Sequence, residues 1–488
     1  MNRKNLPLIW GIFYFLCLNL ITLIGGGYGI FVDEYYYLAC AKRIAAGYID
    51  HPPLSVFFLY ALGISGDSIF SLRLLPTISA GLTVFLTGSL VEKWKGDSFS
   101  ITLASISVMT IPVLQVLFGF YSMNAFEVLF VVGLVYFLTK VSENNTYLTL
   151  IGIIAGVGIL NKHTFIVYFL AITVPFFLLN GREYLLSKWL WFGALLSIII
   201  VSPNLYWLYQ NNFSSLAFYK GATSKNINLP YLQILLDQIL SQNPATLPIW
   251  ISGIIFYFRK KEFRFIAIAY LILLFLLLAT RSSRPDRIAA IYPVLLAGGV
   301  ILINPLFKKI LMALILLVGI VLAPVSLPIL SPETASKYVN FLGIVPEIEK
   351  GKKSGLPQWF GDRMDWKNLA DAIEESTKKL SSEEKQNSII VANFYGHASS
   401  LEYYKSSIPV VSGHNSYFLW QNEITLTPQN YILIGKERFT NWKDYFEEVS
   451  EIGTFSRRFT KEQNIPIYLA RRPRISKEEL FGKLKDFR

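Results

Sequence analysis

The sequence predicts a mainly α-helical protein that crosses a membrane many times and carries a small α/β domain at its C-terminal end. Of its 488 residues, 53% are hydrophobic and only 16% are charged, whereas soluble proteins carry about 25% charged residues. The mean hydropathy is +0.44, and about eleven apolar stretches approach the roughly 20 residues that a helix needs to cross a bilayer. After residue 330 the composition becomes that of an ordinary soluble domain.

Composition also excludes several other classes of protein. The apolar content is far above that of a disordered chain, and the two cysteines, Cys17 and Cys40, are too few for a disulfide framework. Residues 1–330 hold 22 Lys and Arg against 12 Asp and Glu, so most of the net charge of +12 lies in the apolar part. Because no basic soluble face remains to bind nucleic acid, we expect this charge to serve membrane anchoring and an anionic ligand.

The expected spans take up most of the first 330 residues. In chain order they cover residues 8–29, 69–91, 99–117, 122–140, 147–161, 164–180, 189–209, 244–258, 264–280, 287–303 and 309–327. The first apolar run is long and no A-x-A-type cleavage site follows it, so we expect an uncleaved span rather than a signal peptide. These spans define a transmembrane domain over residues 1–330 and a soluble domain over residues 331–488.

The positions of Lys and Arg orient the spans, because basic residues gather on the cytosolic side of a membrane. With the N-terminus in the cytosol, 13 of the 22 basic residues of the apolar part lie in inside segments. An odd number of spans then places the C-terminal domain outside. Two outer segments are long, and their stretches 44–62 and 229–240 have the apolar spacing of helices that lie at the membrane surface.

The C-terminal part alternates helix and strand patterns. Residues 365–380 have the spacing of an amphipathic helix, and the apolar runs 387–394, 430–435 and 465–472 are typical of buried strands. This alternation predicts a small α/β domain on the outer face.

Acidic groups follow the first span on the outer side. Asp33 and Glu34 are adjacent, and paired carboxylates at a membrane interface are costly unless they are solvated or partnered. They are either a solvated loop edge or a general base with its helper. Asp50 and His51 precede two prolines that hold them in extended geometry, and this pair is either structural or part of the same site.

Three further polar clusters interrupt apolar stretches on the same expected side. They are Asn124 and Glu127 on one helix face, Lys162 and His163 at a tight turn, and Arg281, Arg284 and Arg287 in one short loop. A helix–helix hydrogen bond, a polar turn and binding to lipid head groups are the structural alternatives. Because all five clusters fall on one side, we expect carboxylates for proton abstraction and cations for a phosphate to face a common cavity.

Several of these motifs together resemble a known family. The matching stretches are VDEYYYLACAKRIAAGYIDHPPL (32–54), FYSMNAFEVLF (120–130), LNKHTFIVYF (160–169), NPATLPIWISG (243–253), AIYPVLLAGG (290–299), NFYGHASSLEYY (393–404) and SGHNSYFLW (412–420). The chain resembles bacterial GT-C glycosyltransferases of the protein-mannosyltransferase-like group, which are related to the lipid A aminoarabinose transferase. The last two stretches are typical of one bacterial branch of that group.

The resemblance implies a GT-C-type bundle in the bacterial inner membrane. Such an enzyme moves a sugar from a polyprenyl-phosphate donor to a lipopolysaccharide, glycolipid or protein acceptor on the periplasmic face, with inversion of the anomeric centre. It implies that Asp33 is the general base or orients the acceptor, with Glu34 beside it. The residues implied at the donor phosphate are His51, Lys162, Arg281, Arg284 and Arg287.

The sequence departs from the family pattern at Asn124, where many relatives have Asp, and Glu127 is the possible substitute. Some enzymes of this type bind a divalent metal ion through such acids, for which Asp33, Asp50 and Glu127 are the candidates; no other cofactor is implied. Two other functions stay open. A flippase for lipid-linked sugars predicts ionisable residues in mid-span and inverted repeats, and a non-catalytic glycolipid-binding subunit is consistent with Asn124.

Overall fold

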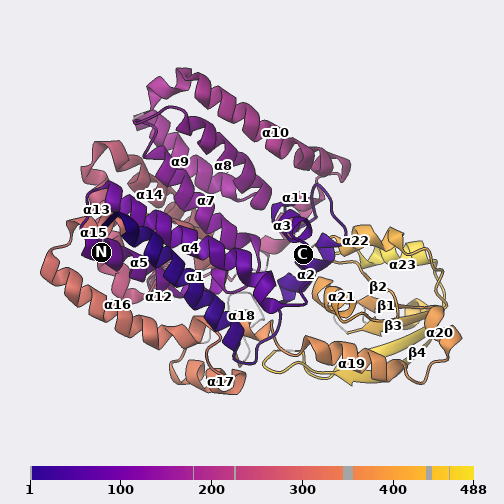
Figure 1. The fold of residues 1–488 in the computed structure, drawn as a ribbon. Coiled ribbons are helices and arrows are strands. Elements are labelled where there is room, and N and C mark those ends of the chain that lie inside the picture. The colour runs from indigo at the N-terminus through magenta and orange to yellow at the C-terminus, as the bar shows by residue number, and fades with distance from the viewer. Residues whose placement is uncertain are drawn as a thin grey trace.

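A computed structural model gives the arrangement of the chain and describes residues 3–179, 181–224, 227–344, 355–435, 442–460 and 462–487. Figure 1 shows a bundle of long helices with a smaller domain of strands and helices attached at one end. The bundle comes from the N-terminal two thirds of the chain and the strands from the C-terminal third.

The expected spans coincide with helices or with bent pairs of helices. In chain order these are α1 (Leu6–Ile24), α4 (Ile69–Lys93), α5 (Ser98–Met109), α6 (Pro112–Phe118), α7 (Met123–Leu138), α8 (Tyr147–Asn161), α9 (Phe165–Leu179), α10 (Lys188–Gln210), α13 (Leu247–Arg259), α14 (Arg264–Ala279), α15 (Tyr292–Leu302) and α16 (Pro305–Ser326). Residue 180, the last of the span expected over 164–180, lies outside the described residues.

Some of these helices are long and apolar enough to cross a membrane. Within the described ranges, six helices meet both criteria, namely α1, α4, α10, α14, α15 and α16, some together with an adjoining 3₁₀ turn, while α7, α8 and α9 are apolar but shorter. The pair α5 and α6 also qualifies as one span, although it bends by 67°. Pro112 begins α6 directly after this bend, because proline cannot donate the hydrogen bond that would continue the preceding helix.

Two glycines let α13 and α15 pack with their backbones in contact. A Cβ atom at Gly299 would lie 1.8 Å from the carbonyl oxygen of Ile249, and one at Gly253 would lie 2.0 Å from that of Leu295. Without side chains at these positions the helices approach closely, which is a common packing mode between membrane helices.

Shorter helices lie in the loops between the spans and in the connection to the C-terminal sheet. Between the spans are α2 (Val32–Ala41), α3 (Leu54–Ala61), α11 (Ser214–Thr223) and α12 (Tyr231–Ser241), with the 3₁₀ turns η2 (Arg182–Leu186), η3 (Pro244–Thr246), η4 (Lys261–Phe263) and η5 (Pro285–Ile291). The 3₁₀ turn η1 (Arg3–Asn5) precedes the first span, and α17 (Pro332–Phe341) and α18 (Gln358–Gly361) follow the last. The surface helix expected over 229–240 corresponds to α12. Of the stretch 44–62, only α3 is helical, since Pro52 and Pro53 prevent the helix from starting earlier.

The C-terminal domain contains a five-stranded sheet with the order β2-β1-β3-β5-β4. Its elements are α19 (Trp366–Thr377), α20 (Ser382–Gln386), β1 (Ser388–Ala392), α21 (Tyr395–Tyr403), β2 (Val410–Ser412), α22 (Tyr417–Trp420), η6 (Gln421–Glu423), β3 (Asn430–Ile434), η7 (Trp442–Asp444), β4 (Phe446–Phe455), β5 (Ile465–Pro473) and α23 (Lys477–Leu484). β1 is parallel to β2 and β3, whereas β5 is antiparallel to β3 and β4.

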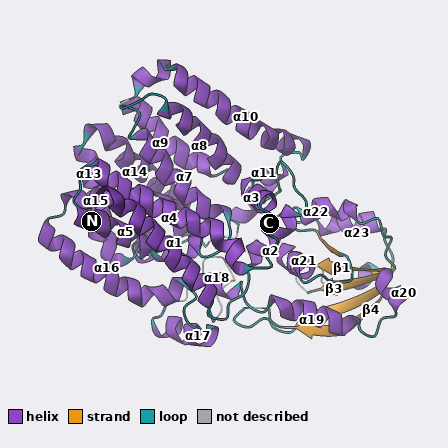
Figure 2. Cartoon of the chain, viewed as in Figure 1, coloured by secondary structure: helices purple, strands orange, loops and turns teal. Residues whose placement is uncertain are grey.

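Both faces of this sheet are covered by helices (Figure 2). α19 and α21 pack against one face through Leu369 and Leu401, and α23 packs against the other through Leu480. The helix expected over 365–380 and the three expected strands are confirmed as α19, β1, β3 and β5. β2 and β4 carry little local signal in the sequence, because β2 is only three residues long and β4 is an edge strand with several exposed acidic residues.

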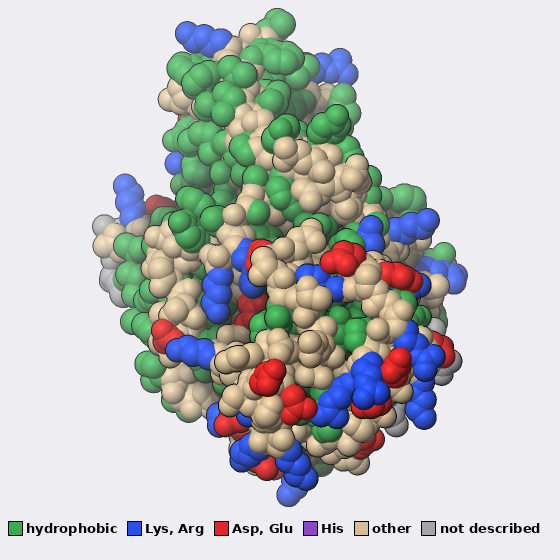
Figure 3. Space-filling view, turned by 90° about the vertical axis from the view of Figure 1, so that its right-hand side faces the viewer, with side chains coloured by type: hydrophobic (Ala, Val, Ile, Leu, Met, Phe, Trp, Pro, Cys, Tyr) green, Lys and Arg blue, Asp and Glu red, His purple; other side chains and the backbone are tan. Residues whose placement is uncertain are grey.

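The sheet domain packs directly against the first loop of the bundle, which joins α1 to α4 and contains α2 and α3. Residues of α2 share one buried hydrophobic cluster with Trp366, Ala398 and Tyr417 of the C-terminal domain. Figure 3 shows charged side chains gathered over the sheet domain, while hydrophobic side chains dominate the helices above it. The first loop therefore lies between an apolar bundle and a polar domain.

Candidate functional site

Asp33 lies in the first turn of α2, where the helix dipole favours a negative charge. Its Oδ1 accepts a hydrogen bond of 2.6 Å from the hydroxyl of Tyr395 at the start of α21. The side chain is half-buried. The candidate base is thus held by a residue that lies 362 positions away in the sequence.

Glu34 is fully buried and is held on every side by protein donors. Arg73 of α4 donates to both of its oxygens, and the backbone N–H groups of Phe31 and Tyr121 donate at 2.7 and 2.8 Å. Burial opposes ionisation of Glu34, yet Arg73 and the N–H donors outweigh it and hold its pKa below the ordinary value. These contacts fix the start of α2 against α4 and against the segment between α6 and α7.

Asp50 is held by the same two parts of the chain as Asp33. Tyr36 of α2 donates a hydrogen bond of 2.8 Å to its Oδ1, and Asn415 of the C-terminal domain donates one of 3.2 Å to its Oδ2. Burial raises the pKa of Asp50, although its neighbour His51 and the Tyr36 hydroxyl act in the opposite direction.

His51 is 2% exposed and lies between aromatic rings. The rings of Tyr37 and Tyr48 are centred 4.8 and 4.9 Å from it and are tilted by 32° and 37° relative to its plane. Its Nδ1 lies 2.9 Å from the carbonyl oxygen of Pro52, so Nδ1 carries the proton and donates in the neutral imidazole. The pair of prolines and the tyrosines therefore fix the orientation of this ring.

Glu127 and Lys162 form an ion pair between the start of α7 and the end of α8. Lys162 Nζ lies 2.7 Å from Glu127 Oε2, and the carboxylate is almost completely buried. Asn161, the residue before Lys162, donates to the carbonyl oxygen of Met123 at 2.8 Å. Asn124 follows Met123 and is half-buried. Glu127 thus pairs with the predicted cation, and Asn124 lies three residues before it on the same helix.

The loop that carries Arg281, Arg284 and Arg287 contains an ion-pair cluster and one arginine outside it. Arg284 pairs with Asp286 at 3.3 Å, and Lys162 and Arg287 lie within electrostatic reach of the same carboxylate. This cluster contains three cations, Lys162, Arg284 and Arg287, and two carboxylates, Glu127 and Asp286. It therefore carries one positive charge in excess. Arg281 is exposed and stacks 4.8 Å above the ring of Tyr231 on α12.

Contacts between aromatic, amide and histidine groups connect these clusters. The backbone N–H of Met123 donates to the hydroxyl of Tyr37 at 3.4 Å, which joins the start of α7 to α2. His163 contacts Asn204 and Tyr219 at 2.9 and 2.7 Å. Burial lowers the pKa of His163, and the nearby His51 lowers it further, whereas the hydrogen bond with Asn204 raises it.

The structure therefore brings the first loop, the start of α7, the end of α8 and η5 to one end of the bundle. The residues that hold the candidates in place are Tyr36, Arg73, Asp286, Tyr395 and Asn415, and none of them is a predicted site residue. The partners of Arg73, Tyr395 and Asn415 lie 39 or more positions away, so spacing offers no signal for these contacts. Asp286 lies two positions from Arg284 and Tyr36 lies 14 positions from Asp50, so local sequence could have indicated these two.

The three candidate metal ligands do not fit a metal ion. Within the described ranges, no three His, Cys, Asp or Glu side chains are placed to hold one. Asp33 and Asp50 accept hydrogen bonds from tyrosine and asparagine side chains, and Glu127 pairs with Lys162. These carboxylates are thus engaged by protein donors rather than gathered around a common point.

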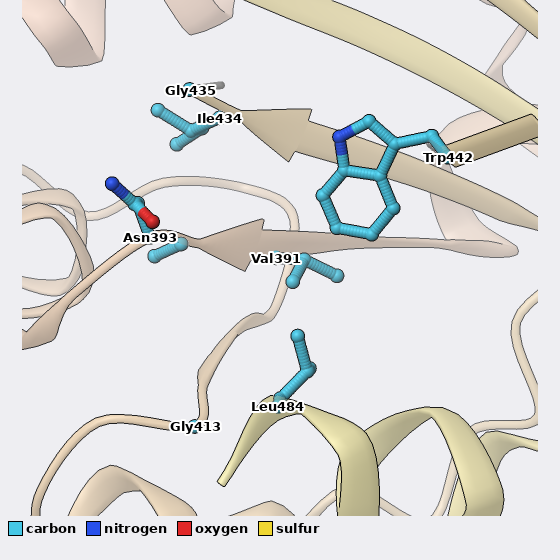
Figure 4. A pocket seen from close by; sticks show the side chains of 8 residues that line it. Val391, Asn393, Gly413, Ile434, Gly435, Trp442 and Leu484 are labelled. Carbon is cyan, nitrogen blue, oxygen red and sulfur yellow. The ribbon is translucent and has the colours of Figure 1, made fainter. Parts of the chain in front are cut away.

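A small pocket lies away from this cluster, at the carboxyl ends of β1 and β3 in the C-terminal sheet (Figure 4). Asn393, Gly413, Gly435 and Trp442 are among its lining residues, and none of the candidate site residues is. It is therefore separate from the site described above.

Comparisons with known proteins agree with the expected family resemblance. A family model described as dolichyl-phosphate-mannose-protein mannosyltransferase matches residues 50–207. A search of curated protein sequences finds no match.

The fold is shared with solved structures. ArnT from Cupriavidus metallidurans in the apo state superposes with a TM-score of 0.64 at 12% sequence identity, covering 94% of this chain and 97% of that chain. ArnT from the same organism bound to undecaprenyl phosphate gives a TM-score of 0.61 at 11% identity, with the same coverage of 94% and 97%. At this identity the likeness establishes the fold.

Fold and motifs together define a multi-pass membrane protein with the architecture of GT-C glycosyltransferases. The predicted fold class, a GT-C-type bundle with a small C-terminal α/β domain, is confirmed. The resemblance to the protein-mannosyltransferase-like group is confirmed as well, by the family model over residues 50–207 and by the shared fold.

Proposed function

We propose that the protein is a membrane glycosyltransferase that takes a sugar from a polyprenyl-phosphate donor at the periplasmic face of a bacterial inner membrane. The observation that carries this proposal is that Asp33 and Asp50 lie at the same end of a GT-C-type bundle as the cation cluster of Lys162, Arg284 and Arg287. The two groups are linked through the hydrogen bond between Met123 and Tyr37 and through the proximity of His51 to His163. The polyprenyl phosphate is suggested by the related fold of ArnT, which has been solved with undecaprenyl phosphate.

In this proposal Asp33 is the general base. It accepts the proton of the acceptor hydroxyl while the hydroxyl oxygen attacks the anomeric carbon of the donor sugar. The bond between that carbon and the phosphate oxygen breaks, and its electron pair leaves with the polyprenyl phosphate. A single displacement of this kind inverts the anomeric centre and forms no covalent sugar–enzyme intermediate.

Lys162, Arg284 and Arg287 then stabilise the phosphate as it leaves. Because Lys162 and Arg284 already pair with Glu127 and Asp286, the excess positive charge of this cluster is small in the absence of ligand. An incoming phosphate also contacts these cations. They bind it most strongly in the transition state, when negative charge develops on it. We place His51 at the wall of the donor site and Arg281 at its edge.

We infer that the acceptor is a glycolipid, a lipopolysaccharide or a membrane-associated protein, since the site lies where the bundle meets a polar domain. The test is mass spectrometry of surface glycans and glycolipids from a deletion strain, and from the same strain complemented with the wild-type gene. The proposal predicts the loss of one sugar residue of defined mass and its return on complementation. Identical glycan and glycolipid profiles in the two strains would contradict it.

A further inference from the structure

The C-terminal domain reaches the candidate site with side chains, and this contact is more than surface packing. Tyr395 donates to Asp33 at 2.6 Å, and Asn415 donates to Asp50 at 3.2 Å. Both of the outer-loop aspartates therefore hold a hydrogen bond from this domain. The two donors come from the motifs NFYGHASSLEYY (393–404) and SGHNSYFLW (412–420), to which the proposed chemistry assigned no role.

The ring of Tyr395 is fixed on both sides. It stacks on His414 with centroids 5.2 Å apart and an interplanar angle of 10°, and it packs on Tyr36 at 4.8 Å. Its backbone N–H also donates to Nδ1 of His414 at 3.3 Å. A phenol held in this way delivers its hydroxyl to one place, so it restricts the rotamers that Asp33 can adopt.

The domain itself is anchored to α2 close to this contact. Arg43, just after α2, pairs with Glu402 through two hydrogen bonds of 2.9 Å and with Glu423 at 2.8 Å. Its guanidinium also lies 4.7 Å above the ring of Trp420. The backbone of Ser416 donates to Tyr36, the same tyrosine that holds Asp50. These contacts leave little freedom between α2 and α21.

We propose that Tyr395 is a positioning residue that fixes the Asp33 carboxylate for proton abstraction, so that the C-terminal domain forms part of the active site. The inference rests on the proposed glycosyltransferase function. Tyr395 acts through Asp33 and need not touch the sugar. A displacement of about 1 Å at a reacting group costs about 100-fold in rate, and loss of one hydrogen bond to a carboxylate allows a displacement of that size.

The test compares Tyr395→Phe with Tyr404→Phe. The hydroxyl of Tyr404 contacts the Tyr35 hydroxyl at 3.0 Å, so the control also removes a phenolic contact between α21 and α2 while leaving the carboxylates untouched. The assay follows polyprenyl phosphate released by the purified full-length protein in nanodiscs. Its donor is the polyprenyl-linked sugar fraction of the host membrane and its acceptor is the host glycolipid fraction.

Tyr395→Phe is expected to lower kcat by about 10- to 100-fold with the donor KM within about twofold, because donor binding does not need Asp33. Tyr404→Phe keeps the wild-type kcat. In an Asp33→Asn background, adding Tyr395→Phe costs nothing further, since the two residues act as a unit.

Wild-type kcat in Tyr395→Phe overturns the inference. So does an equal loss in both tyrosine variants together with a lower melting temperature, because that pattern indicates domain docking alone. If the wild-type protein itself releases no polyprenyl phosphate, the proposed function fails, and this outcome is distinct from the other two.

Discussion

Arg73 of α4 and Glu34 of α2 form a buried ion pair, with Nη2 of the arginine 2.8 Å from Oε2 of the glutamate and the two side chains 4% and 0% exposed. Nε of Arg73 makes a second contact of 2.9 Å to the other carboxylate oxygen. This pair joins the first loop to a long helix of the bundle. It separates the roles of two adjacent acids, because Glu34 is committed to Arg73 while Asp33 contacts Tyr395.

Glu34→Gln is therefore expected to destabilise the protein rather than to act on the chemistry directly. Removing one partner of a buried ion pair leaves an uncompensated charge, which costs about 3–5 kcal/mol of folding free energy. Thermal unfolding of the purified protein in detergent measures the effect. Asp371→Asn is a suitable control, since its pair with Lys367 is exposed and such pairs contribute about 1 kcal/mol or less. Normal stability of Glu34→Gln with lost transfer would instead make Glu34 catalytic.

The His163 pKa predicts a pH dependence of stability. Because the folded-state pKa lies below the ordinary value of 6.5, the unfolded chain takes up the proton first as the pH falls. The contribution of His163 is therefore fully present above pH 6.5, and it is lost as the pH falls through the folded-state value. The difference in melting temperature between wild type and His163→Gln, measured between about pH 5 and 8, should become smaller at the acidic end. A constant difference between the two proteins over this range is the contrary result.

The cation cluster predicts a graded loss of affinity for a phosphate lipid. Arg287→Ala should weaken binding of undecaprenyl phosphate by about tenfold or more, since a hydrogen bond to a charged group contributes about 1.5–3 kcal/mol. Arg281→Ala should weaken it less, because that side chain stacks on Tyr231 at the edge of the cluster. Arg259→Ala, at the opposite end of α13 from the site, serves as the control. Equal affinities of all three variants and wild type would show that the phosphate does not bind at this cluster.

Close helix packing predicts a large effect from one added methyl group. Gly253→Ala places a Cβ atom 2.0 Å from the carbonyl oxygen of Leu295, so α13 and α15 must separate. Overpacking of this kind costs about 1–3 kcal/mol or more. Gly133→Ala in α7 meets only Leu86, at 3.9 Å, and should be tolerated. Thermal unfolding of both variants checks the contrast, and equal melting temperatures would show that α13 and α15 can separate without cost.

Most of the fold could be predicted from the sequence, because apolar runs of membrane length and buried strands are local signals. The bend at Pro112 was not predicted, since the run over 99–117 is apolar throughout and only the proline marks the break. The edge strand β4 was missed for the opposite reason, because its exposed glutamates hide the strand pattern.

The site was predictable in part. The residue types and their common side indicated Asp33, Lys162 and the arginines as candidates. Their partners depend on long-range contacts, such as that between Asp33 and Tyr395, which no local spacing encodes. The separate roles of Asp33 and Glu34 were equally invisible, since they follow from the position of Arg73 across the bundle.

The most direct test of the central claim is sugar transfer by the Asp33→Asn variant, measured as release of polyprenyl phosphate by purified protein in nanodiscs. Loss of a general base predicts a rate lower by about 100- to 10,000-fold, with undecaprenyl phosphate binding and melting temperature as in wild type. Transfer by Asp33→Asn at the wild-type rate would contradict the assignment of Asp33 as the base and, with it, the proposed mechanism.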